Sequence, residues 1–232
     1  MKIDHFICFR DIPLLYGRVP KVANSSIKAA LCRLLKSKKN EGDRTTSDNY
    51  WRTKTEGETF MVSSHRARMS RGTHFCFSFV RNPFDRIISA YNNKIIELKE
   101  TPAPMQSMGL FHSMPFGLFL EVIASTSDEN LDIHLLPQSK IICLDGQLIP
   151  NFVGHLETID DDWNTLQKTL RRERLPSLGK LPGKNVRRSP DKQDIQNYFE
   201  DSGFIRIITD RYGEDIERFY GNKRIEELTH RQ

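Results

Sequence analysis

Residues 14–28 read LLYGRVPKVANSSIK, in which an apolar strand runs into a polar turn and then into a helix that begins with hydroxyl and basic groups. We predict a strand over Leu14–Val19 and a helix over Ser25–Leu35, where apolar residues recur with the helical period. A turn from a strand into a helix directs backbone N–H groups and the positive end of the helix dipole at one point. The stretch therefore predicts an anion-binding loop.

A second stretch has the same organisation. Residues 79–91 read FVRNPFDRIISAY and overlap the strand-like segment His74–Val80, in which apolar aromatic residues alternate with smaller ones. Pro83 suits the first turn of a helix, which we predict to extend to about Leu98. Two such units in one chain indicate a ligand with two separated anionic groups.

Strands and helices alternate along the rest of the chain. Short strands are predicted at Lys140–Leu144 and Phe152–Gly154, and residues 36–57 and 176–190 are predicted to be loops. Further helices are predicted over Pro115–Ala124, Thr158–Arg171, Asp191–Thr209 and Asp210–Tyr220. This order favours an α/β fold: one three-layer domain over residues 1–232, with a mainly parallel central sheet and a P-loop-like anion-binding loop.

Composition narrows the class of protein. The chain has 232 residues, 38% hydrophobic residues and a net charge of +5, which is typical of a globular protein and favours anionic ligands without implying nucleic acid. No apolar run approaches the roughly 18–20 residues that span a membrane, and the N-terminus lacks the features of a secretory signal. We therefore expect a cytoplasmic protein with no membrane span, whose oligomeric state the sequence leaves open. The four cysteines show no metal-ligand spacing, so we expect reduced thiols and no metal.

These motifs resemble those of the carbohydrate sulfotransferase family, especially the Golgi chondroitin and HNK-1 type enzymes and their bacterial relatives. Residues 20–28 look like the family's 5′-phosphosulfate loop. Residues 79–91 are similar to its 3′-phosphate site, in which a strand-end arginine and a serine eight residues later bind one phosphate. The segments DIHLLPQ (132–138) and FVGHLET (152–158) also agree, and the chain lacks the anchor and extra cysteines of the Golgi branch, which favours the bacterial one.

The resemblance implies a donor, an acceptor and a set of site residues. The donor is 3′-phosphoadenosine 5′-phosphosulfate (PAPS), a co-substrate that needs no metal, and the acceptor is a hydroxyl of a glycan or glycoconjugate. Lys21 is expected to neutralise charge on the departing 5′-phosphate, and Arg81 and Ser89 to bind the 3′-phosphate. The implied donor-binding residues are Lys21, Val22, Ala23, Asn24, Ser25, Ser26, Arg81, Ser89 and Asn185.

A general base is expected for the acceptor hydroxyl. His65 is the leading candidate, because it lies upstream of the His74–Val80 strand, where related sulfotransferases often carry a catalytic histidine. His134 is the second candidate. Glu157 is a third, although a buried structural carboxylate is the plainer interpretation of that residue.

Plainer interpretations also exist for the other residues. Ser25 and Ser26 suit N-cap positions. Asn24 stands where a glycine would be easiest, and asparagine tolerates the left-handed backbone expected there. Arg81 could form an ion pair with Asp85, and Arg86 is expected on the helix surface or paired with acidic residues.

Two other functions remain open. A P-loop-like kinase is disfavoured because the first loop lacks the G-x-x-x-x-G-K-[ST] pattern. A non-catalytic module that binds polyanions would use the basic stretch Arg171–Arg188, but the aromatic residues lie in core-like strand positions and do not alternate with exposed basic residues. We therefore expect no nucleic-acid partner.

Overall fold

The computed structural model describes residues 4–37, 39–183 and 197–230, which fall into two units. The first unit comprises Met1–Val80 and Lys140–Arg187, and the second comprises Arg81–Ser139 and Arg188–Gln232. Each unit is described by itself.

A five-stranded sheet forms the centre of the first unit, in the order β3-β1-β2-β4-β7. β1 is antiparallel to both of its neighbours, whereas β2, β4 and β7 are mutually parallel. The sheet is therefore mixed and not mainly parallel, because β1 and β3, which the sequence analysis did not identify, contribute both antiparallel pairings. The strands are β1 (Phe6–Phe9), β2 (Leu14–Gly17), β3 (Thr59–Val62), β4 (Phe75–Val80) and β7 (Phe152–His155).

One face of this sheet is covered by α1 (Asn24–Leu31), α2 (Asp48–Thr53) and α8 (Ile159–Arg172). Tyr16 stacks on Phe77 with ring centroids 5.1 Å apart, and the next residue on that face of β4, Phe79, contacts Trp163 of α8 at 6.0 Å. Trp51 of α2 contacts Phe9 at 6.3 Å. Alternation of side chains along each strand puts these aromatic residues on one face, which buries them under the helices.

The opposite face carries α3 (Ser64–Met69) and α7 (Gln138–Ile142). The Arg66 guanidinium of α3 lies 5.7 Å from the ring centroid of Phe60, which pairs with Cys8 on this face. A Cβ atom added at Gly17 would lie 3.4 Å from the Ile142 side chain of α7. Helices therefore cover both faces of the sheet in this unit, as the predicted α/β layering requires.

Two predictions about local structure are wrong in this unit. Most of the segment Lys140–Leu144 is helical, and only β5 (Cys143–Leu144) is extended, pairing with β6 (Gln147–Leu148) in a separate two-stranded sheet. A short apolar run fits a helix or a strand equally well, so its sequence did not distinguish them. Residues 36–57 are not loop throughout, because α2 forms there with the Ser47 hydroxyl accepting a hydrogen bond from the Asn49 N–H.

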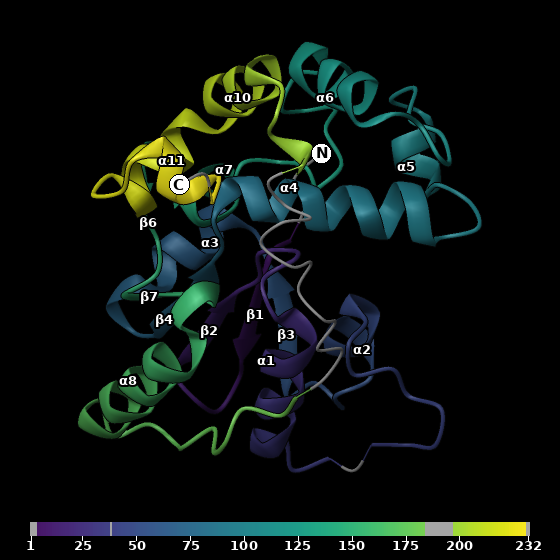
Figure 1. Ribbon diagram of the computed structural model, residues 1–232. Coiled ribbons are helices and arrows are strands. Elements are labelled where there is room, and N and C mark those ends of the chain that lie inside the picture. Colours follow the sequence, from purple (N-terminus) through teal and green to yellow (C-terminus); the bar gives the residue numbers. More distant parts are fainter. Residues whose placement is uncertain (1–3, 38, 184–196, 231–232) are drawn as a thin grey trace. The chain divides into compact units, whose positions relative to one another are not determined.

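The second unit is helical, and Figure 1 shows α6 and α10 side by side within it. α4 begins at Pro83, as predicted, and continues as a π-helical segment (η3, Asn92–Glu97). Two helices divided at 209–210 are predicted in the tail, but α10 continues across that boundary and has its non-helical backbone at Tyr212. The helices are α4 (Pro83–Tyr91), α5 (Ala103–Gln106), α6 (Phe116–Ser125), α10 (Ser202–Tyr220) and α11 (Ile225–Leu228).

The cysteines are free thiols, with Cys8, Cys76 and Cys143 buried and Cys32 partly buried. Among the described residues, no helix is both long enough and apolar enough to cross a bilayer.

Candidate active site

The first of the two predicted anion-binding segments connects β2 to α1. Lys21 and Ala23 have φ values of 68° and 48°, in the left-handed region, and α1 begins at Asn24. Left-handed backbone costs a residue other than glycine on the order of 1 kcal/mol, and such strain is concentrated at functional sites. The glycine-like positions of this loop are therefore Lys21 and Ala23, and the prediction that placed one at Asn24 is wrong.

The Asn24 side chain fixes the start of α1 to the end of β2. Its amide oxygen accepts a hydrogen bond from the Tyr16 hydroxyl, and its amide nitrogen donates to the Val19 carbonyl oxygen at 2.8 Å. Tyr16 is buried, and burial raises the pKa of its hydroxyl, which keeps it a neutral donor. The loop geometry thus depends on side-chain contacts beneath it.

Ser25 and Ser26 do not cap α1. The N-cap is Ala23, which makes no side-chain capping bond, so the two serines lie in the first turn of the helix. The interpretation of these serines as caps is therefore wrong. Lys21 is half-buried at the turn that precedes them.

One carboxylate joins the two sides of this loop. Asp48 forms ion pairs with Arg18, at 2.8 Å, and with Lys28, at 2.5 Å. Arg18 precedes the loop and Lys28 follows it, and their side chains are only 8% and 3% exposed. Lys28 Nζ also donates to the Thr46 carbonyl oxygen at 2.9 Å.

The pKa values of the ionisable groups in this cluster are shifted by burial and by the charges of their neighbours. Burial is the largest influence on Asp48 and would raise its pKa, but the cations of Arg18 and Lys28 outweigh it, so the pKa is lowered. For Lys28, burial is again the largest influence, and it lowers the pKa despite the attraction of Asp48. The His5 carbonyl oxygen accepts a hydrogen bond from the Arg18 N–H at 2.9 Å, and burial and then the Arg18 charge lower the pKa of the His5 ring to about 4. Asp48 therefore stays ionised, and His5 stays neutral, at neutral pH.

His65 lies in the first turn of α3 and is exposed. α3 follows β3, which runs in the same direction as β2, because both are antiparallel to the strand between them. His65 and Lys21 therefore both follow strands that end at the same edge of the sheet. Glu157 is in the 3-10 turn η4 (Leu156–Thr158) and is exposed, so the interpretation of it as a buried carboxylate is wrong.

The second predicted anion-binding segment includes Arg81, the residue at which the second unit begins. The buried Gln138 side chain accepts a hydrogen bond from the Arg81 N–H at 2.9 Å and donates to the Arg81 carbonyl oxygen at 2.8 Å. The Asp215 carboxylate in turn accepts hydrogen bonds from the N–H groups of Gln138 and Ser139, both at 2.7 Å. Part of the DIHLLPQ segment is thus a support for the backbone of Arg81.

The helix after Arg81 is fixed by its own polar residues. Asn82 is the N-cap of α4, accepts a hydrogen bond from the Phe84 N–H at 3.1 Å, and donates to the Leu228 carbonyl oxygen at 2.6 Å. Ser89 is half-buried on the same helix. Arg86 is buried and donates to the Leu136 carbonyl oxygen at 2.9 Å, so the expectation that it lies on the helix surface is wrong.

Two acid–histidine pairs also occur in this unit. Asp85 lies 3.0 Å from Nε2 of His230. His134 Nδ1 lies 2.7 Å from Asp132, where burial would raise the pKa of the carboxyl, but hydrogen bonds and charge from His134 lower it overall. The Asp132 carboxylate therefore orients the His134 ring.

Of the residues predicted to bind the donor, one cannot be placed. Asn185 lies outside the described residues. Within the described part of the chain, no group of three or more histidine, cysteine, aspartate or glutamate side chains could hold a metal ion. Sequence reasoning missed Asp48, although the pair Ser47-Asp48 ahead of apolar Tyr50 and Trp51 is a recognisable helix start.

Comparison with known proteins adds independent information. Residues 4–221 match the family model described as "Sulfotransferase family". The chain is 24% identical over 216 residues to carbohydrate sulfotransferase 14 of Mus musculus, and 23% identical over 234 residues to carbohydrate sulfotransferase 10 of Xenopus laevis. These alignments cover 84% and 89% of this chain but only 54% and 64% of the relatives, so the chain spans between half and two thirds of their length. No solved structure matches.

Proposed function

Because the chain belongs to the sulfotransferase family, we propose that it transfers a sulfuryl group from PAPS to a hydroxyl of a carbohydrate or glycoconjugate. The observation that carries the proposal is the strand–loop–helix at residues 14–31, whose left-handed turn leads into a helix with no side-chain cap. A helix start of this kind suits an anion, because its N–H groups and dipole face the ligand. The two named relatives support the carbohydrate acceptor.

Lys21 and the first turn of α1 would stabilise the leaving group. In the reaction the acceptor oxygen forms a bond to sulfur, while the bond from sulfur to the 5′-phosphate oxygen breaks and its electron pair stays on that phosphate. The negative charge that develops there is neutralised by Lys21, by the loop residues Val22 and Ala23, and by the helix start at Asn24, Ser25 and Ser26. Catalysis of this kind depends on positioning and on charge stabilisation.

Arg81 and Ser89 would bind the 3′-phosphate of the same donor. A guanidinium forms strong, charge-assisted hydrogen bonds to phosphate, and a serine hydroxyl adds one donor. The two hydrogen bonds between the Gln138 side chain and the N–H and carbonyl groups of Arg81 support this role, since they fix the backbone of the residue that carries the charge. Asn185 is proposed as a further donor contact.

His65 would accept the proton of the acceptor hydroxyl. It is exposed and follows a strand that ends at the same edge of the sheet as β2. His134, whose Nδ1 contacts Asp132, is the second candidate base. Exposed Glu157 remains the alternative base.

The proposed function is tested by transfer of labelled sulfate from PAPS to a panel of glycans and small alcohols. Wild type is expected to label at least one glycan, and His65→Ala to lose most of the rate. The control is His112→Ala, at an exposed histidine of the second unit, which should retain the rate. Full activity of His65→Ala would contradict the choice of base. Phosphate transfer from ATP that depends on magnesium would favour a kinase instead. Binding of polyanions that falls steeply with salt, without any transfer, would favour a binding module.

The cytoplasmic location and the bacterial-type branch stay predictions. Cell fractionation with an antibody against the chain tests the location, and recovery of the protein in the membrane fraction would contradict it.

A further inference from the structure

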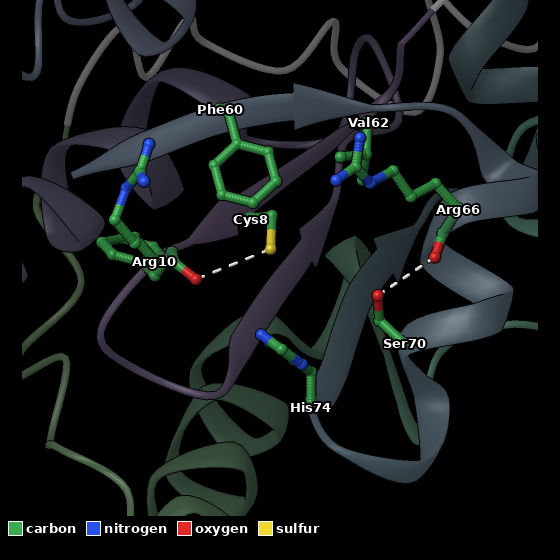
Figure 2. Close-up of a pocket in the computed structure, with 8 residues that line it drawn as sticks. Cys8, Arg10, Phe60, Val62, Arg66, Ser70 and His74 are labelled. Atoms are coloured by element: carbon green, nitrogen blue, oxygen red, sulfur yellow. Dashed lines mark hydrogen bonds between the residues drawn. The ribbon is translucent and has the colours of Figure 1, made fainter. Parts of the chain in front are cut away.

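A pocket in the first unit and a buried pair in the second bring charged groups together outside the first loop. The pocket, of about 430 Å³, contains Arg10 and Arg66 beside the Phe60 ring (Figure 2). Both arginines are exposed, and exposed cations attract anions of any kind, so the pocket specifies no ligand. The pair of Asp85 and His230 at the start of α4 is more specific, because its carboxylate is buried and its geometry is fixed.

Asp85 lies between the two residues that are proposed to bind the 3′-phosphate. Arg81, Asp85 and Ser89 follow one another at intervals of four residues. Asp85 and Ser89 both belong to α4, and residues one turn apart share a helix face. The Asp85 side chain is only 10% exposed, so water screens its charge weakly. An unneutralised carboxylate at this position would repel a bound 3′-phosphate and attract the guanidinium of Arg81.

His230, two residues after α11, contacts both oxygens of this carboxylate. Its Nε2 lies 3.0 Å from one carboxylate oxygen of Asp85 and 3.3 Å from the other. The His230 backbone is left-handed, with a φ of 56°. Histidine adopts this conformation more often than most residues do, but it still costs energy and persists only where the surrounding contacts require it. The position of the ring over Asp85 is therefore imposed by the fold.

The residues before His230 are fixed to the same turn of α4. The Leu228 carbonyl oxygen accepts a hydrogen bond from the side-chain amide of Asn82, the N-cap of α4, at 2.6 Å. Leu228 is 2% exposed and Thr229 is fully buried. The segment that carries His230 thus contacts the first turn of α4 twice, through a neutral hydrogen bond at Asn82 and through the carboxylate of Asp85.

We propose that His230 is a positioning residue of the 3′-phosphate site. It neutralises Asp85, so that the carboxylate neither repels the phosphate nor draws Arg81 away from it. A histidine can carry a positive charge near neutral pH, and a charged N–H forms a strong hydrogen bond to a carboxylate. The proposal rests on the proposed function, because it assigns a further residue to the donor site of the same reaction.

Calorimetric titrations with adenosine 3′,5′-bisphosphate and adenosine 5′-monophosphate test this role. His230→Gln keeps a hydrogen-bond donor but removes the charge, so it should lower the affinity for the bisphosphate about tenfold and hardly change that for the monophosphate. Asp85→Asn should bind the bisphosphate at least as tightly as wild type, and adding His230→Gln to Asp85→Asn should then have little effect. The matched control is His112→Gln, at an exposed histidine of the same unit, which should bind both nucleotides like wild type.

Three results would overturn the proposal: unchanged affinity, or equal losses for the two nucleotides, in His230→Gln; a loss of about tenfold for the bisphosphate in Asp85→Asn; or the same loss from His230→Gln with and without Asp85→Asn. Thermal unfolding checks that each variant is folded, and the Asp85→Asn titration decides the question if His230→Gln does not fold. Failure of the proposed function is distinct, because wild type would then bind neither nucleotide and transfer no sulfate.

Discussion

The loop of residues 20–26 and the strand end at Arg81 are each supported by one aspartate, and the two aspartates meet different groups. Asp48 pairs with two cations that flank its loop. Asp215 is fully buried and accepts hydrogen bonds from the backbone N–H groups of Gln138 and Ser139. Gln138 in turn holds the backbone of Arg81. Asp48 therefore offsets the positive charge around the first loop, whereas Asp215 fixes the backbone that holds Arg81.

Because of this difference, the contributions of Asp48 and Asp215 to folding stability change in opposite directions as the pH falls. The pKa of Asp48 is lowered, so its stabilisation is complete above the unfolded value of about 3.9 and is lost as pH falls through the folded pKa. The pKa of Asp215 is raised, chiefly by burial. Its contribution is complete below about 3.9 and is lost as pH rises through the folded pKa. The two carboxylates therefore give the chain opposing pH dependences.

The largest expected effect is the loss of turnover on removal of the Lys21 charge, which belongs to the first loop itself and not to Asp48, the aspartate that supports the loop. Lys21→Ala should lower the turnover of sulfate transfer by about 10²–10³, the usual cost of removing one group that stabilises transition-state charge. Labelled-sulfate assays at saturating PAPS measure it. Lys36→Ala, at a lysine whose side chain is 80% exposed, is the control and should stay at the wild-type rate. A loss below tenfold in Lys21→Ala would assign the charge to another residue.

Removal of the second support comes next. Asp215→Ala leaves the N–H groups of Gln138 and Ser139 without their acceptor, and should lower the free energy of unfolding by about 2–4 kcal/mol. Urea unfolding followed by circular dichroism measures the change. Asp201→Ala also removes a carboxylate that accepts a backbone N–H, but at an exposed helix start, and should cost about 1 kcal/mol. Equal losses in the two variants would contradict the special role of Asp215.

Removal of the first support should cost less, since Asp48 is partly exposed. Asp48→Asn should lower the free energy of unfolding by about 2 kcal/mol at pH 7, because Lys28 stays buried with its charge unpaired. The deficit should shrink as pH falls below about 4, where wild type also loses the charge of Asp48. Unfolding curves at several pH values test this. Asp11→Asn, at a 63% exposed carboxyl, should have little effect, and a deficit in Asp48→Asn that does not change with pH would be contrary to the account.

The smallest effect concerns backbone strain in the first loop. Ala23→Gly should stabilise the chain by less than about 1 kcal/mol, because relief of the left-handed conformation exceeds the added entropy of the unfolded chain only slightly. Ala30→Gly, in the interior of α1, should destabilise it by about 1 kcal/mol. Thermal melts distinguish the two, and destabilisation by Ala23→Gly would mean that residue 23 is not strained.

The elements that the sequence predicted well are those with a local signal. β4 has six alternating residues, α8 has acidic residues in its first turn and basic ones in its last, and Pro83 marks the start of α4. β1 has only four residues, all buried, and such a run has no period that identifies a strand. α2, with six residues, was missed for the same reason.

The site was predictable where it depends on nearby residues and not where distant ones meet. The loop at Lys21 is visible as a turn between a strand and a helix. Its left-handed residues are not visible, because an alanine and a lysine carry no signal for that conformation. Asp48 lies 20 residues from Lys28, and Gln138 lies 57 residues from Arg81, so only the folded chain shows these contacts.

We propose that the first loop binds the 5′ end of the donor and that Arg81 binds its 3′-phosphate. Calorimetric binding of adenosine 3′,5′-bisphosphate and adenosine 5′-monophosphate to wild type, Arg81→Ala and Lys21→Ala tests it, with Arg206→Ala at an exposed position of α10 as the control. Arg81→Ala should lose at least tenfold in affinity for the bisphosphate and almost none for the monophosphate, whereas Lys21→Ala should weaken both. Equal losses for the two nucleotides in Arg81→Ala, or none for either, would contradict the account.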